Sequence, residues 1–169
     1  KTNPGLRKLD RIDIYTKAEF ETNETPVPVQ TIHFSYSYQL CDNYKVSGGV
    51  GTGKLTLDSL WFSYNGNERQ KKKKYVFKYS SPRNLINANP DYNSSHTDRW
   101  GNYKPTTKNP DNVGNNDYPY TIQDTTSSNV YASAWNLEKI LLPGGGLMRV
   151  DYEADDYAYV QDKRACLMT

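Results

Sequence analysis

Hydrophobic and polar residues alternate most regularly between Val29 and Leu40. The apolar positions of this alternation are Ile32, Phe34, Tyr36, Tyr38 and Leu40. A period of two places one set of side chains against a core and the other set toward water. The pattern therefore predicts an antiparallel β-strand over this run.

A second run, over residues 55–64, changes phase in its middle. Its apolar positions are Leu55 and Leu57 in one phase, and Leu60, Phe62 and Tyr64 in the other. One extra residue in a strand shifts the phase in this way, so we expect a β-bulge near Asp58–Ser59. A turn at residues 65–67 follows, and the alternation over residues 75–79 predicts the partner strand.

The last quarter of the chain carries the clearest turn. Pro143-Gly144-Gly145-Gly146 separates two apolar-rich runs. Since Pro presets φ and Gly accepts a positive φ, this punctuation predicts a β-hairpin. Further short strands are expected over residues 9–15, 135–142, 147–152 and 156–160. The fold is predicted to be all-β, a single domain over residues 1–169 with an antiparallel sheet or sandwich of about seven strands.

Residues 81–129 differ from the rest, because Asn, Asp, Pro and Tyr dominate there. The segment exceeds the roughly 12–15 residues at which loops without secondary structure become uncommon. Either it packs on its own aromatics as an ordered loop, or it is partly mobile. Its rings, which suit stacking on a sugar, are candidate glycan-binding residues: Trp100, Tyr103, Tyr118 and Tyr120. The alternative is that these rings form a small core of the loop itself.

Composition narrows the classes of partner. The net charge of +2 argues against a dedicated nucleic-acid or membrane-surface protein, and no run approaches the roughly 20 apolar residues that span a bilayer. The 36% hydrophobic share includes 15 Tyr, so the core relies on Tyr or on neighbours outside this chain. Because the chain begins without Met, we expect a mature product or a piece of a longer protein. Cys41 and Cys166 form either one disulfide or two free thiols.

Two motifs suggest anion binding. Gly48–Lys54 has the spacing of a phosphate-binding loop, but Leu55 stands where Ser or Thr would hold Mg²⁺, and a strand follows instead of a helix. We interpret it as a Gly-rich hairpin turn. Lys71–Lys74 resembles a nucleic-acid patch, yet a single run beside a turn in a near-neutral chain is typical of a solvated tip.

Acidic residues supply the catalytic and metal candidates. Asp151, Glu153 and Asp155 alternate on an expected strand, which would put their carboxylates on one face, roughly 7 Å apart. Carboxylate pairs about 5–10 Å apart serve glycoside hydrolysis. Asp111 and Asp117 could offer oxygens to Ca²⁺, although their segment lacks the EF-hand order and a closing Glu. The alternatives are a solvent-facing acidic edge and a turn cluster, and we expect no cofactor.

The two histidines lie in different settings. His33 is on the polar side of the first strand, and His96 is in the polar segment. Neither has a visible nucleophile or metal partner, so we do not expect a catalytic triad.

Several motifs, in order, resemble a region of very large exported proteins of the Bacteroidetes that often precedes Rhs/YD-type repeats. They are Gly53–Leu57 leading to Tyr75–Tyr79, then Asp98–Lys104, then Trp135–Leu137 continuing through Gly146 to Asp151–Tyr157. The resemblance extends from about Lys8 to Ala165. It implies an extracellular or cell-surface scaffold without catalytic residues, related to repeats that wind into a β-sheet shell.

This chain lacks the repeated YD signature itself, so the resemblance does not place it inside such a shell. Two short motifs resemble O-glycosylation sites of that phylum, Asp58-Ser59-Leu60 and Asp124-Thr125-Thr126.

The sequence leaves three candidate functions for this chain. The leading one is a non-enzymatic structural and interaction segment of a large secreted or cell-surface protein. Its partners would be neighbouring domains of the same polypeptide, with glycans or other surface proteins as further candidates. The second is a glycan-binding or adhesion module that uses the four rings. The third is a carbohydrate-active enzyme that uses Asp151 and Glu153.

Overall fold

The computed structural model describes residues 7–45, 52–79, 89–98, 101–117, 121–122, 124–154, 159–160 and 162–164. Its main feature is an antiparallel six-stranded sheet in which the strands follow one another in chain order. The strands are β1 (Arg11–Ile14), β2 (Gln30–Lys45), β3 (Thr52–Tyr64), β4 (Tyr75–Tyr79), β5 (Leu137–Leu141) and β6 (Leu147–Arg149). A separate hairpin pairs β7 (Tyr159–Val160) with β8 (Lys163–Arg164).

Helices are few and short. The α-helices are α1 (Lys17–Thr22) and α2 (Thr125–Tyr131). The 3₁₀-helices are η1 (Glu68–Lys72), η2 (Ser94–His96), η3 (Thr106–Lys108) and η4 (Pro110–Asn112). The prediction of a mostly β fold is therefore confirmed.

The predicted bulge and terminal hairpin are both present. Ser35 pairs with Ser59 and Tyr36 pairs with Leu57, so Asp58 is the extra residue of β3. The hairpin between β5 and β6 closes through a 2.8 Å hydrogen bond from the Leu142 N–H to the Gly146 carbonyl. The strand predicted over 147–152 is too long, because β6 ends at Arg149.

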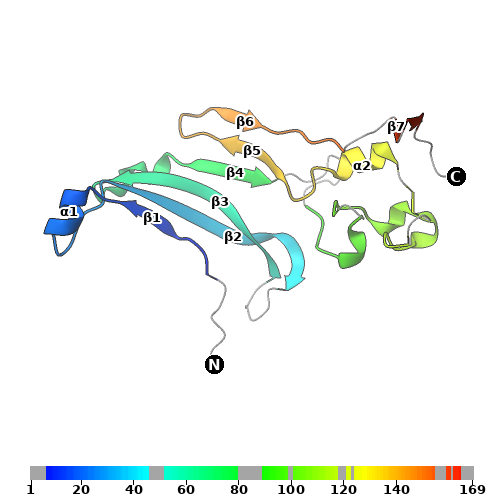
Figure 1. Ribbon diagram of the computed structural model, residues 1–169, viewed down its shortest axis with the longest axis horizontal. Coiled ribbons are helices and arrows are strands. Elements are labelled where there is room, and N and C mark those ends of the chain that lie inside the picture. The colour runs from blue at the N-terminus through cyan, green and yellow to red at the C-terminus, as the bar shows by residue number, and fades with distance from the viewer. Residues whose placement is uncertain are drawn as a thin grey trace, which may run out of the picture.

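The sheet forms one curved layer (Figure 1). Helix α1 lies at one end of it, and α2 lies with the 3₁₀-helices of the long segment at the other end. We call that second region, residues 89–98, 101–117, 121–122 and 124–136, the polar lobe. In the part of the chain that the structure describes, no helix covers either face of the sheet.

The pairing register separates two faces. One face, which we call the apolar face, carries Ile12, Ile14, Ile32, Phe34, Tyr36, Leu57, Leu60, Phe62, Tyr75, Phe77, Ile140 and Met148. The opposite face is mixed. On β2 and β3 it carries mostly polar side chains and two rings: Thr31, His33, Ser59, Trp61 and Ser63. On β4 to β6 it carries three cationic and three apolar side chains: Lys78, Lys139, Arg149, Val76, Leu141 and Leu147.

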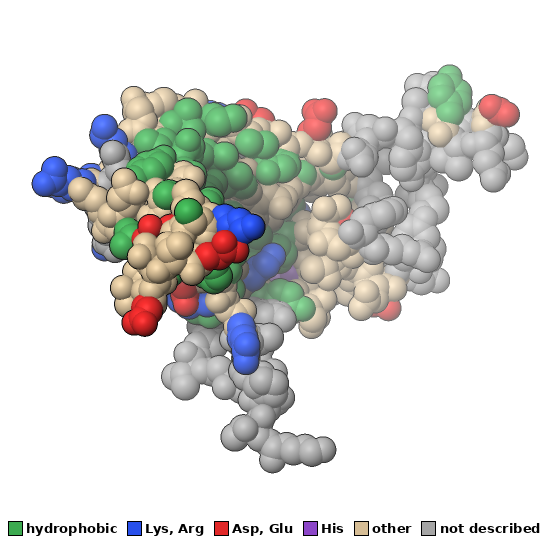
Figure 2. All heavy atoms as spheres, turned by 60° about the vertical axis from the view of Figure 1, so that its left-hand side comes forward, with side chains coloured by type: hydrophobic (Ala, Val, Ile, Leu, Met, Phe, Trp, Pro, Cys, Tyr) green, Lys and Arg blue, Asp and Glu red, His purple; other side chains and the backbone are tan. Residues whose placement is uncertain are grey.

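The apolar face of the sheet is incompletely buried. Among the described residues, only Leu40, Cys41 and Ala134 are buried hydrophobic residues. Every apolar-face side chain is half-buried or exposed. Figure 2 shows hydrophobic side chains gathered in a broad patch on the upper part of the surface, where β4 to β6 lie. Within the described ranges, the sheet thus has a hydrophobic face that no second layer covers.

Candidate functional site

The carboxylates proposed for catalysis lie just after β6 in an open depression of about 500 Å³. Residues 150–154 are not in a strand, so alternation along a strand does not align Asp151 with Glu153. Asp151 pairs with Arg149 at 3.2 Å, and both side chains are more than half exposed. Asp155 lies outside the described residues.

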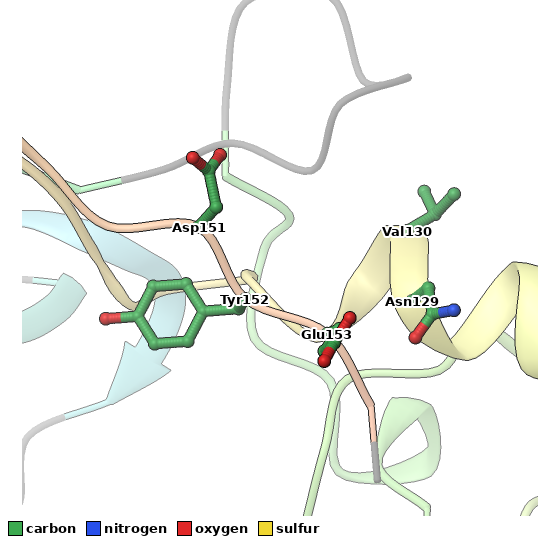
Figure 3. A pocket seen from close by; sticks show the side chains of 5 residues that line it. All are labelled: Asn129, Val130, Asp151, Tyr152 and Glu153. Atoms are coloured by element: carbon green, nitrogen blue, oxygen red, sulfur yellow. The ribbon is translucent and has the colours of Figure 1, made fainter. Parts of the chain in front are cut away.

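Contacts on either side of these carboxylates hold the segment in place. The Tyr152 hydroxyl donates to the Leu137 carbonyl at 2.8 Å, and the Ala154 N–H donates to Asn129 Oδ1 at 2.8 Å. In Figure 3, Asp151 and the Tyr152 ring leave the chain in different directions, and Glu153 lies beside Asn129. The arrangement is an exposed acidic rim around a shallow hollow rather than an enclosed acid–base pair.

Of the four candidate glycan-binding rings, the structure describes Tyr103 alone; Trp100, Tyr118 and Tyr120 lie outside the described residues. Tyr103 packs edge-on against Tyr131 and Trp135, with ring centroids 5.4 and 5.2 Å away. Burial, with smaller contributions from Tyr131 and Asp91, raises the pKa of the Tyr103 phenol above its ordinary value. This partly buried ring therefore packs against other rings of the polar lobe.

A buried polar network holds the lobe together. The Asn115 amide donates to the carbonyls of Ser95 and Lys104, at 3.1 and 2.6 Å, and accepts from Asn109 Nδ2 at 2.9 Å. The Lys104 ammonium donates to the backbone carbonyl of Ile122. Burial lowers the pKa of Lys104, and the charge of Asp98 partly opposes that shift. The ordered-loop alternative thus describes this part of the segment.

The two Ca²⁺ candidates lie in the lobe without a ligand set around them. Asp111 is in η4 with a positive φ of 50°. Asp117 ends a turn in which its own N–H donates to the Gly114 carbonyl. Within the described ranges, no group of three or more His, Cys, Asp or Glu side chains could hold a metal ion. The geometry here is that of consecutive turns.

His33 has a partner that sequence inspection did not reveal. Its Nε2 shares a 2.8 Å hydrogen bond with Ser63 Oγ on the neighbouring strand, and its ring stacks on Trp61 at 5.0 Å. Lys71 Nζ lies 5.8 Å from the centre of the Trp61 ring. Ser63 is only 3% exposed, so its hydroxyl is enclosed and serves packing rather than attack on a substrate. Only the pairing register could have revealed this contact.

The Gly-rich motif continues into a strand, as predicted. Gly53 lies in β3 with φ of +108°, and a Cβ there would stand 1.8 Å from the Tyr38 carbonyl oxygen. Close backbone approach therefore explains this glycine. Residues 46–51 lie outside the described part of the chain.

The cysteines and the two glycosylation-like motifs differ in accessibility. Cys41 is a buried free thiol whose pKa is raised by that burial, and Cys166 lies outside the described residues. Ser59 is 3% exposed within β3, whereas Thr125 is exposed at the start of α2. Of the two hydroxyls, only that of Thr125 is accessible in the folded chain.

No family model matches this chain, and neither does any curated protein or solved structure. None of the helices in the described segments is long and apolar enough to cross a membrane. The features of this chain that bear on its function are therefore the two faces of the sheet and the polar lobe.

Proposed function

We propose that this chain is a non-enzymatic structural and interaction segment of a large exported protein, in which the apolar face packs against a second β layer of the same polypeptide. One observation carries the proposal. All six strands contribute apolar side chains to this face, yet none of those side chains is fully buried, and those on the edge strands β1 and β6 are 40–54% exposed. A sheet with one apolar face is stable when another layer covers that face.

The exposure values support a covering layer of the same kind. Met148 is 54% exposed, and Ile12 and Ile14 at the other edge are 40% and 41% exposed. Apolar patches of this breadth mark interaction surfaces, and two sheets pack face to face about 10 Å apart by interdigitating such side chains. Export and a scaffold role rest on the resemblance to the region before Rhs/YD-type repeats.

Two findings make us prefer this function to the alternatives. Tyr103 packs against other rings of the polar lobe, which removes one ring from the proposed sugar-binding platform. Asp151 and Glu153 are exposed on an open surface, where water would compete with any general acid or base.

The test compares two neighbouring residues with almost equal exposure on opposite faces of β6. Leu147 is 56% exposed and Met148 is 54% exposed, but only Met148 lies on the apolar face. Met148→Cys and Leu147→Cys are each placed in the native full-length polypeptide with Cys166→Ser. The rate of thiol alkylation is then measured under native conditions and in urea.

We expect native Met148→Cys to react at least about tenfold more slowly than Leu147→Cys, because a covering layer excludes the reagent. In urea the two rates should converge. Equal native rates would show that nothing covers the apolar face, and the proposal would fail.

A further inference from the structure

The opposite face carries a feature that the proposed packing does not use. Lys78 on β4 is the register partner of Lys139 on β5, and Lys139 is the partner of Arg149 on β6. Residues paired in this way point to the same face of a sheet, and neighbouring strands lie about 4.8 Å apart. Three cationic side chains therefore lie abreast, and we call them the cation row.

Without a bound partner, the mutual repulsion of these cations lowers the stability of the fold. Like charges placed directly opposite one another destabilise a sheet. Lysine on an edge strand protects against strand addition, but that explanation does not reach Lys139, which is paired on both sides, with Lys78 and with Arg149. An anionic partner would explain why three cations lie side by side here.

Two cations of the row have an acidic neighbour. Lys139 pairs with Glu138 at 3.0 Å, and Arg149 pairs with Asp151 at 3.2 Å. The Lys139 and Glu138 side chains are 38% and 26% exposed, and those of Arg149 and Asp151 are 55% and 56% exposed. Solvent weakens ion pairs that it reaches, so a ligand anion can compete with the carboxylate, most readily at Arg149.

An apolar row lies directly beside the cations on the same face. Val76, Leu141 and Leu147 pair with one another across the same three strands, two residues along each strand from the cations. Leu141 and Leu147 are 41% and 56% exposed. An acidic polysaccharide would match both rows. It carries anionic groups at regular spacing beside the apolar faces of its sugar rings, and each pyranose is about as long as the distance between neighbouring strands.

We propose that the cation row Lys78–Lys139–Arg149, with the apolar row beside it, binds an acidic polysaccharide that runs across the strands. A nucleic acid fits less well, because the whole chain carries only +2, without the basic excess that is typical of nucleic-acid-binding domains. This binding surface is separate from the apolar face, so it stands or falls independently of the proposed packing.

The test measures binding of the full chain to immobilised polygalacturonate and dextran sulfate, with neutral dextran as the reference. The row variant is Lys78→Gln/Lys139→Gln/Arg149→Gln. The matched control is Lys72→Gln/Lys73→Gln/Lys74→Gln, which removes the same charge from the exposed lysine run beside η1. Thermal melting checks that each variant is folded, and Lys139→Gln alone provides the smallest change at the centre of the row.

We expect the row variant to lose about tenfold or more in affinity for at least one acidic polymer, which is about 1.4 kcal/mol shared among three charged contacts. The control should lose less than about twofold, because its lysines lie outside the row. Lys139→Gln should lose affinity in the same direction. The two polymers then distinguish carboxylate from sulfate recognition. The proposal is overturned if wild type binds neither polymer, if both triple variants weaken equally, or if a single-stranded oligonucleotide binds more tightly than either polymer.

Discussion

The sheet and the polar lobe differ in which side chains they bury. The sheet collects apolar side chains on one face and leaves them half-exposed. The lobe has few aliphatic residues, yet it buries Lys104, Asn109 and Asn115 to between 5% and 8% exposure. The hydrophobic face of the sheet is therefore the open surface, whereas polar side chains are enclosed both in the lobe and on the opposite face of the sheet, where Ser59 and Ser63 are 3% exposed.

Hydrogen bonding explains how a polar region can be enclosed. Burying an amide is unfavourable unless its donors and acceptors are paired. Asn115 meets this condition by bonding two backbone carbonyls and a second asparagine. Apolar side chains have no such local solution, because they need a complementary layer. The described part of the lobe thus pairs most of its buried polar atoms locally, with Asn109 Oδ1 as an exception, whereas the apolar face of the sheet has no second layer over it among the described residues.

The two described tryptophans offer the largest test of this contrast. Trp135 in the lobe donates from Nε1 to the Pro90 carbonyl at 2.7 Å and packs on Tyr103. We expect Trp135→Ala to lower the free energy of unfolding by about 3–5 kcal/mol. Both rings are partly buried. Trp61→Ala on the sheet should cost only about 1–2 kcal/mol, because the buried Trp61 Nε1 has no hydrogen-bond partner among the described residues and its removal relieves that penalty.

Urea unfolding followed by far-UV circular dichroism measures both variants, since fluorescence would change with the tryptophans themselves. Phe replacements at the two positions serve as controls that keep ring packing. If Trp61→Ala proved the more costly variant, the sheet would be the better-packed region and the contrast would be wrong.

Buried polar side chains provide a second, smaller test. Asn115→Ala removes the partner of two carbonyls and of Asn109 Nδ2, so we expect it to cost about 2–3 kcal/mol. Ser63→Ala removes a single hydrogen bond to His33 and should cost about 0.5–1.5 kcal/mol. Amide hydrogen exchange locates the effect, because the first variant should expose the amides of residues 93–117 and spare those of β2. Uniform exchange across both regions would indicate that the lobe has no separate network.

The difference between the regions also explains what the sequence could predict. Alternation of side chains located β2, β3 and β4, and the phase change between Leu57 and Leu60 located the bulge, because both patterns are local. The end of β6 was missed, because the apolar pattern continues to Tyr152 while its hydroxyl turns back to bond Leu137.

Long-range pairing was beyond sequence inspection. The cation row combines Lys78 with two residues far along the chain, and only the register of β4, β5 and β6 brings them together. The lobe was recognised as different in composition, but its interior depends on Asn115 reaching Ser95 and Lys104. An isolated asparagine gives no local signal of such a role, because the same residue is common in exposed turns.

The smallest effect concerns the start of α2, whose short, Thr- and Ser-rich sequence is a poor helix former. Hydrogen bonds from the side chain of Ser127, and then from the backbone N–H groups of Ser127 and Thr126, lower the pKa of Asp124 below its ordinary value of 3.8. Its capping contribution is therefore fully present above that value and is lost as the pH falls through the lowered pKa.

Asp124→Asn keeps an acceptor at the cap but loses the charge. We expect the melting temperature of the variant to lie slightly below that of wild type at pH 6. The gap should close as the pH falls well below 3.8. Asp124→Ala, which removes the acceptor as well, should remain less stable over the whole range. A gap between wild type and Asp124→Asn that stayed constant with pH would mean that geometry alone, and not the carboxylate charge, stabilises the polar lobe at this point.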